Sequence, residues 1–273
     1  MLLAWVCGVI ALVWFFLAWL LYLFVKGFGL LRPRFFTSDL ADVGPLNPEA
    51  GGALHGIVGT LEQVGLATAA VVPVAILTAV YLHEIKGRLA PLVRFIVDAM
   101  SGLPSIVAGL LVYTLWVRSH DFSGAAAAAG LAILMLPTVT RASEEILRTV
   151  PDSLREGSLA LGAPQWRVVF RIVLPTARAG LFTAVILGVA RAVGETAVLI
   201  LTALGSDTLN TNPFSGPQSS LPLFVYKLYR LPNSTQVARA WTGGLVLVLL
   251  VLLLFVIARA IAKRGDTSRK GKR

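Results

Sequence analysis

Six long apolar stretches constrain this chain more than any other feature of its sequence. The hydrocarbon core of a bilayer is about 30 Å thick, and a helix needs about 20 apolar residues to cross it. Six stretches reach that length, at residues 3–25, 57–82, 94–117, 124–142, 177–203 and 240–262. A backbone that faces lipid must satisfy its own hydrogen bonds, which a helix does within one segment. We therefore predict an all-α integral membrane protein with six transmembrane helices.

The composition supports this class of protein and excludes others. Only 14% of the 273 residues are charged, against about 25% in soluble domains. Lysine and arginine outnumber aspartate and glutamate by 24 to 14. Basic loops beside a bilayer explain that excess better than nucleic-acid binding does. The chain has one cysteine, Cys7, and three dispersed histidines, so we predict no metal site.

The polar segments between the apolar stretches define the expected organisation. Its parts are a first transmembrane helix at 1–25, an outer loop at 26–56, a core of five transmembrane helices at 57–263 and a basic cytoplasmic tail at 264–273. Inside the core lie a long charged loop at 143–176 and a second outer loop at 204–239. With both termini in the cytoplasm, the inner segments hold 16 basic residues and the outer ones 7, as the positive-inside rule requires.

The first apolar stretch by itself favours the opposite orientation. Lys26, Arg32 and Arg34 follow it, and no basic residue precedes it. Cytoplasmic termini therefore require that later segments override this signal, or that a basic leader lies upstream.

Two of the apolar stretches have distinctive interiors. Gly102 and Pro104 interrupt the third one, and such a break is tolerated where neighbouring helices or a cavity satisfy the freed backbone groups. The fourth is rich in alanine from Ala125 to Ala129, which favours close packing between helices over contact with lipid.

The charged loop at 143–176 predicts two short helices that form a compact knob on the cytoplasmic face. Pro151 fits a first helical turn, where its missing N–H costs nothing. Gly162 supplies a left-handed residue to end that helix near Leu161, and Pro164 opens a second helical piece up to Val173. A knob of this kind is suited to docking a protein, although charged helical loops without a partner are also common in membrane proteins.

A pair of charges inside the fifth apolar stretch is the main candidate for a substrate site. Arg191 and Glu195 are four residues apart, hence neighbours on one helix face, and charges near the bilayer midplane usually face an aqueous path. A guanidinium offers forked donors to an oxyanion. Glu195 suits an anion that carries a proton, such as hydrogen phosphate, and disfavours sulfate. The alternative is a self-neutralising pair that only locks two helices.

Other residues accompany this pair. Gly194 leaves room for a ligand to approach the backbone, and Thr196 follows on the same predicted path. Arg141, at the inner end of the fourth stretch, is either a second anion station or an arginine that reaches the cytoplasmic interface. We expect Asp98 to pair with a neighbouring basic group.

The knob carries a recognisable motif. Its residues fit the spacing E-A-A-x3-G-x9-I-x-L-P at Glu156, Gly157, Ser158, Gly162, Ile172, Leu174 and Pro175. This resembles the cytoplasmic signature of the permease subunits of ABC-type importers, with two other small residues in place of the two alanines. The resemblance implies a type I (MetI-like) permease fold and docking of the knob on a cytoplasmic ATPase dimer. No G-x-x-x-x-G-K-[ST] motif occurs, so we expect ATP and Mg to bind the ATPase and this chain to bind no cofactor and have no catalytic site.

Further motifs narrow the resemblance. The runs S-G-L-P-S-I-V at 101–107 and R-A-V-G-E-T-A at 191–197 are similar to the A-type permease of the phosphate-specific ABC importer. That family implies a complex in the bacterial cytoplasmic membrane with a C-type permease, the ATPase dimer and an extracytoplasmic phosphate-binding protein. It also implies that Arg191 and Glu195 transfer phosphate, and that Gly102, Pro104 and Ser105 shape a gate.

Several alternatives stay open at this point. The C-type permease has a similar run around the arginine and the glutamate, so this run does not distinguish the A-type from the C-type permease. An ABC permease for sulfate or molybdate is the runner-up, and Glu195 argues against it. A secondary carrier would need no ATPase-docking motif, and a non-transporting scaffold would have no use for the charged pair.

Overall fold

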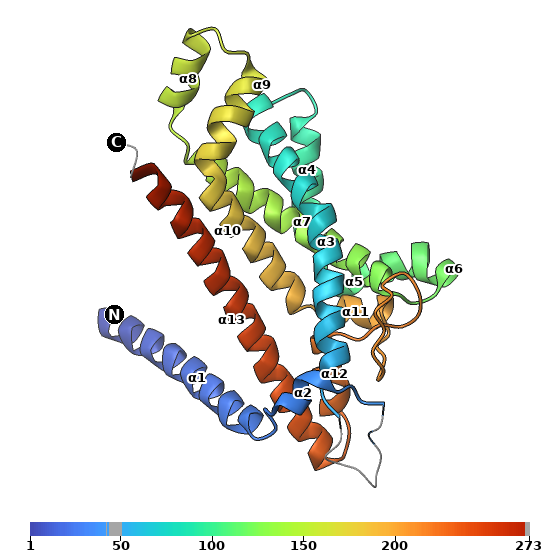
Figure 1. Cartoon of the computed structure of the whole chain (residues 1–273). Helices are drawn as coiled ribbons and strands as arrows, with labels where there is room; N and C mark the ends of the chain where they lie inside the picture. The colour runs from blue at the N-terminus through green and yellow to red at the C-terminus, as the bar shows by residue number, and fades with distance from the viewer. Residues whose placement is uncertain (42, 44–50, 271–273) are drawn as a thin grey trace.

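The computed structural model describes residues 1–41, 43 and 51–270, and the regular elements in this part of the chain are all helical (Figure 1). Five of its continuous helical segments are long and apolar enough to cross a membrane. They comprise α1 (Leu2–Phe28), α3 (Leu54–Val80) with the π-helical turn η1 (Tyr81–Ile85), α7 (Gly124–Arg148), α9 (Gln165–Val168) with η3 (Val169–Val173) and α10 (Leu174–Val193), and α13 (Ser234–Lys270).

Two further helical pieces meet at a sharp bend and are together long and apolar enough for a sixth crossing. They are α4 (Ala90–Ser101) and α5 (Ser105–Val112), the latter extended by η2 (Tyr113–Val117) and α6 (Arg118–His120). Their axes differ by 104°. The break predicted at Gly102 and Pro104 is confirmed, because Gly102 caps α4 and Pro104 takes an extended conformation before α5. The predicted six spans are found if this bent pair counts as one.

The fifth predicted span, 177–203, is not one continuous helix. The helix α10 ends at Val193 with Gly194 as its cap, and three residues separate it from the short α11 (Ala197–Thr202). Glycine is a poor helix former and ends the ladder of backbone bonds easily. The direction of α11 after the break is fixed by its packing on α5. Gly109 of α5 lies so close to the backbone of Val198 that a Cβ added to Gly109 would be 3.1 Å from the Cα of Val198.

The core lies around α7, which crosses the middle of the molecule between α3 and α10 (Figure 1). Its alanine-rich start packs closely, as predicted, with Ala126 and Ala127 fully buried. Small side chains allow the backbones of neighbouring helices to approach each other. The apolar cluster continues through α3, α10 and α11.

The C-terminal end of α1 packs against the first half of α13, in contact through Gly27 and Leu245, and α1 diverges from α13 towards its N-terminus (Figure 1). Most of its surface is exposed. The knob, made of α8 (Asp152–Ala160) and α9, lies at one end of the molecule. The small helices α2 (Pro33–Thr37) and α12 (Leu221–Tyr229) lie at the opposite end.

Candidate functional site

Arg191 and Glu195 meet at the break between α10 and α11. Glu195 lies just beyond the end of α10, where its N–H donates to the carbonyl of Ala192 at 3.2 Å. Its Oε1 is 3.6 Å from Nε of Arg191. The predicted neighbourhood of the two side chains is therefore present, although a helix end brings them together and not a continuous helix face.

The guanidinium of Arg191 is only lightly held. Its Nη1 donates to Oγ1 of Thr138 on α7 at 3.3 Å, and with Glu195 this completes its polar contacts in the described part of the chain. The Arg191 side chain is 46% exposed and that of Glu195 17%. A guanidinium has five N–H donors, so most of those of Arg191 remain available to a ligand.

Thr196 and Gly194 complete this region. Gly194 is exposed, and an added Cβ would meet only helix carbonyls at 3.7 and 3.9 Å. Thr196 caps α11 and lines a cavity of about 500 Å³ between α11 and α12. The break in the helix thus opens towards a hollow on the side of the molecule that carries α12.

Arg141 lies one turn further along α7 than Thr138, in a cluster of charges. Its guanidinium is paired with the carboxylate of Asp98 on α4, as expected for Asp98, and its Nη1 donates to Oε2 of Glu144 at 2.9 Å. Glu144 is 1% exposed and also accepts from Arg94 at 2.7 Å. Arg141 could act as an anion station only if these carboxylates released it.

The bend that was predicted to shape a gate lies on the surface of the isolated chain. Gly102 and Pro104 are exposed, and Ser105 is half-buried at the first turn of α5. Their role in a gate stays a prediction. Among the described residues no group of three or more His, Cys, Asp and Glu side chains is arranged to hold a metal ion.

The first predicted short helix of the knob is α8, and Gly162, with a left-handed φ of 81°, separates it from α9. The prediction of a second short helix that ends at Val173 is wrong, because α9 continues through η3 into α10 as one helical segment, Gln165–Val193. Glu156 and Gly157 are exposed on α8, and Ser158 donates to the carbonyl of Leu154 at 2.6 Å. A Cβ added to Gly157 would meet nothing within 4 Å. No contact in the described chain therefore requires a small residue at this position.

The other motif residues lie where the knob joins α10. Ile172 and Leu174 are half-buried, and Pro175 is exposed in the first turn of α10. Large apolar side chains of the knob face outward, with Leu161 90%, Trp166 57% and Phe170 54% exposed. Exposed apolar groups of this size at one end of a molecule are typical of an interaction surface.

One element of the knob was not predicted from the sequence. Arg155 on α8 binds the carboxylate of Glu84 on η1 through Nε, at 3.1 and 3.2 Å, and through Nη2, at 2.8 Å. It also donates to the carbonyls of Val150 at 2.6 Å and Leu147 at 2.9 Å. The Arg155 side chain is 14% exposed and that of Glu84 8%. This ion pair ties the knob to the end of the helix formed by α3 and η1.

Gln165 strengthens the tie, since its Nε2 donates to the carbonyl of Glu84 at 2.9 Å. The hydrogen bonds that Arg155 donates to Glu84 raise the pKa of the Arg155 guanidinium above its ordinary value, against the opposing effect of burial. The sequence signal for this ion pair is weak. Glu84 stands at the end of an apolar stretch, but this position does not identify a partner 71 residues away.

The sequence of this chain matches a known protein family and named relatives. Residues 71–266 match the family model described as "Binding-protein-dependent transport system inner membrane component". The chain is 41% identical over 250 residues to "Phosphate transport system permease protein PstA 1" of Mycobacterium tuberculosis strain H37Rv, covering 90% of this chain and 81% of that protein. It is 37% identical over 249 residues to "Phosphate transport system permease protein PstA" of Pasteurella multocida, covering 90% and 87%.

Solved structures show the same fold at lower identity. A chain of the inward-facing MetNI methionine ABC transporter aligns with a TM-score of 0.66 at 21% identity, over 78% of this chain and 95% of that one. A chain of a bacterial alginate ABC transporter aligns with a TM-score of 0.66 at 15% identity, over 96% and 94%. The arrangement of helices is therefore the MetI-type permease fold expected from the sequence.

Proposed function

This chain belongs to the PstA-type permeases of the binding-protein-dependent transport family, and we propose that Arg191 and Glu195 pass inorganic phosphate through it. The chain is the membrane-spanning subunit of a phosphate ABC importer. The observation that carries the site assignment is the lightly held guanidinium of Arg191, 46% exposed at the break between α10 and α11.

The chemistry of the pair matches hydrogen phosphate. The free donors of Arg191 bind two phosphate oxygens in a forked geometry. Glu195 accepts a hydrogen bond from the P–OH group, because an ionised carboxylate is an acceptor only. Sulfate has no proton at neutral pH, so its oxygens would be repelled by Glu195. The same carboxylate holds the guanidinium in place when the site is empty.

The knob is the surface that contacts the ATPase. We assign its docking partner as a cytoplasmic ATPase dimer, and in this assignment ATP and Mg bind to the ATPase and not to this chain. Leu161, Trp166 and Phe170 offer an apolar surface for the contact, and the open space above Gly157 accommodates a closely approaching partner helix. Movement of the ATPase would reach the span formed by α3 and η1 through Arg155 and Glu84.

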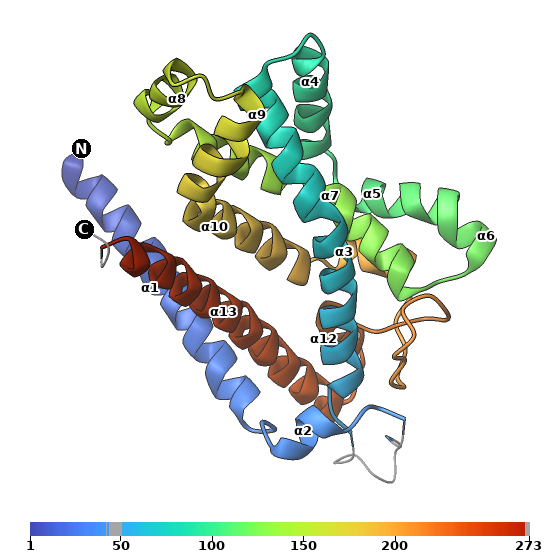
Figure 2. The ribbon, with the colours of Figure 1, turned by 45° about the horizontal axis from the view of Figure 1, so that its top comes forward.

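The remaining partners follow from this orientation. If the knob lies in the cytoplasm, both termini do too, because α1 and α13 each extend from the end that carries α2 and α12 towards the knob end (Figure 2). The end that carries α2 and α12 then faces an extracytoplasmic phosphate-binding protein. A C-type permease would close the path on the side where Arg191 is exposed.

Uptake of labelled phosphate by proteoliposomes that contain the complete complex tests the assignment. Losing a charged hydrogen bond costs about 1.5–3 kcal/mol, so Arg191→Ala should slow ATP-dependent uptake by roughly 10- to 100-fold. Glu195→Gln should reduce discrimination against sulfate. Arg118→Gln is the matched control, because Arg118 is an exposed arginine on α6. Uptake that is unchanged in Arg191→Ala would overturn the proposal.

A further inference from the structure

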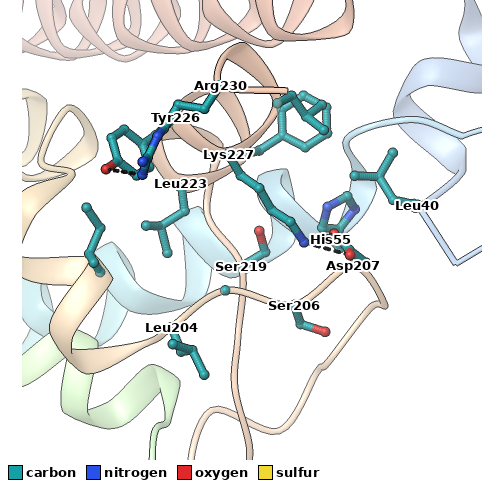
Figure 3. Close-up of a pocket in the computed structure, with 14 residues that line it drawn as sticks. Leu40, His55, Leu204, Ser206, Asp207, Ser219, Leu223, Tyr226, Lys227 and Arg230 are labelled. Carbon is teal, nitrogen blue, oxygen red and sulfur yellow. Dashed lines mark hydrogen bonds and ion pairs between the residues drawn. The ribbon is translucent and has the colours of Figure 1, made fainter. Parts of the chain in front are cut away.

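Two cavities in the outer half of the molecule share part of their lining. The one beside Thr196 has a volume of about 500 Å³, and a second, nearer the outer loops, has about 220 Å³ (Figure 3). Ile200, Tyr226 and Arg230 line both. Ile200 is one turn after Thr196 on α11, so the two lie on the same helix face. The two cavities are therefore neighbours, one near the outer loops and the other beside Thr196, the residue that follows Glu195.

Arg230 lines both cavities. It caps α12, and its guanidinium lies over the ring of Tyr226, 5.1 Å from the centroid. Its Nη1 donates to the hydroxyl of Tyr226 at 2.8 Å. In the described part of the chain Arg230 forms no ion pair, so its charge is not neutralised by a neighbouring carboxylate.

A second cation lies at the far end of the smaller cavity. The Nζ atom of Lys227 is 2.7 and 2.6 Å from the two carboxylate oxygens of Asp207 (Figure 3). His55 lies beside them, 2% exposed, and its Nδ1 has no hydrogen-bond partner among the described residues. A cation beside a carboxylate repeats the chemistry of Arg191 and Glu195.

We propose that Arg230 is an outer anion station, which binds inorganic phosphate on its way from the outer face to Arg191. This inference rests on the proposed function. The open donors of Arg230 bind the phosphate oxygens. Lys227, one turn earlier on α12, lines the smaller cavity as well, but its charge is balanced there by Asp207, so Arg230 carries the uncompensated positive charge. The lining of both cavities is mostly apolar, and apolar surroundings strengthen such a contact because they lower the local dielectric.

The side chain of Arg230 is a suitable target because it is exposed and its described contacts stay within one turn of α12. Its neutralisation should therefore leave the fold intact. In proteoliposomes with the complete complex, Arg230→Gln should slow phosphate uptake about tenfold, as expected for one lost charge-assisted contact. Arg230→Lys should keep most of the rate, and Arg118→Gln should match the wild type.

Thiol labelling gives a readout that a purely structural role would not move. In a Cys7→Ser background, Ile200→Cys places a thiol between Thr196 and Arg230. We expect an anionic sulfonate reagent to label it faster than a neutral reagent of the same size, and inorganic phosphate to protect it. Adding Arg230→Gln should remove both the preference for the anionic reagent and the protection.

The outcomes separate this inference from the proposed function. If the complex moves no phosphate, or Arg191→Ala has no effect, the proposed function fails. If uptake depends on Arg191 but is unchanged in Arg230→Gln, and phosphate does not protect the thiol, the outer station is wrong while the function stands. Loss of uptake in Arg230→Gln without protection by phosphate would assign Arg230 a structural role and also overturn the station.

Discussion

The tie between Arg155 and Glu84 offers the sharpest test of how the knob is connected to the membrane helices. Both side chains are largely buried, with exposures of 14% and 8%. Removing one partner of a buried ion pair costs about 3–5 kcal/mol, because a charge is left without compensation. Glu84→Gln keeps one acceptor oxygen, so we expect a cost near the lower limit, about 3 kcal/mol. At 1.4 kcal/mol per factor of ten, opening of the knob should become roughly 100-fold more frequent.

Hydrogen exchange of the reconstituted complex measures this opening. Amide exchange in α8 should accelerate by roughly 100-fold in Glu84→Gln, while exchange in α13 stays unchanged. Phosphate transported per ATP hydrolysed should fall, because a loosened knob transmits less movement. Unchanged exchange in α8 would refute the view that Glu84 holds the knob.

The chain provides a matched control for burial. Asp152 also pairs with Arg155, at 2.8 Å, but its side chain is 84% exposed. Exposed pairs contribute about 0.2–1 kcal/mol, so Asp152→Asn should change exchange by less than about fivefold. An effect as large as that of Glu84→Gln would show that burial is not the cause.

Arg155 also predicts how the tie responds to pH. Its pKa is raised by the hydrogen bonds to Glu84. The stabilisation is fully present below the ordinary pKa of arginine and is lost only above the raised value. Arg155 therefore stays charged between about pH 6 and 9 and contributes no pH dependence to the opening of the knob in that range. Hydrogen exchange of α8, measured at several pH values, checks this.

Three further outcomes are expected. Gly59→Ala should weaken the packing of the second outer loop (204–239) on α3 by about 1–3 kcal/mol, because the added Cβ would overlap the carbonyl oxygen of Ser219. Faster proteolysis of that loop would show this. Partial burial raises the pKa of the Asp39 carboxyl, but hydrogen bonds from backbone N–H groups, chiefly that of Leu209, lower it by more. The pKa of Asp39 therefore lies below its ordinary value. Its stabilising effect is present at neutral pH and lost on acidification through the lowered pKa, so acid-dependent proteolysis of this loop should be weaker in Asp39→Asn. Leu161→Asp should weaken binding of the ATPase in pull-down of the purified complex without changing the melting temperature, because Leu161 is 90% exposed.

Sequence reasoning reached those features that depend on local backbone chemistry. The bend at Gly102 and Pro104 and the helix stop at Gly162 follow from the conformational limits of glycine and proline. The break at Gly194 has the same local cause, yet the long apolar run around it led to the prediction of a continuous helix. Hydrophobic length identifies a span, but it does not say whether the backbone inside it stays straight.

The sequence by itself determined the class of protein, its spans, the knob and the motif that leads to the family, because length, hydropathy and spacing are written along the chain. Only the tertiary structure decided which distant charges meet. It paired Arg155 with Glu84, engaged Arg141 with Asp98, left Arg191 lightly held and placed Arg230 in the lining of two neighbouring cavities. Such contacts depend on how helices pack, and many pairings of 24 basic and 14 acidic residues are compatible with one hydropathy pattern.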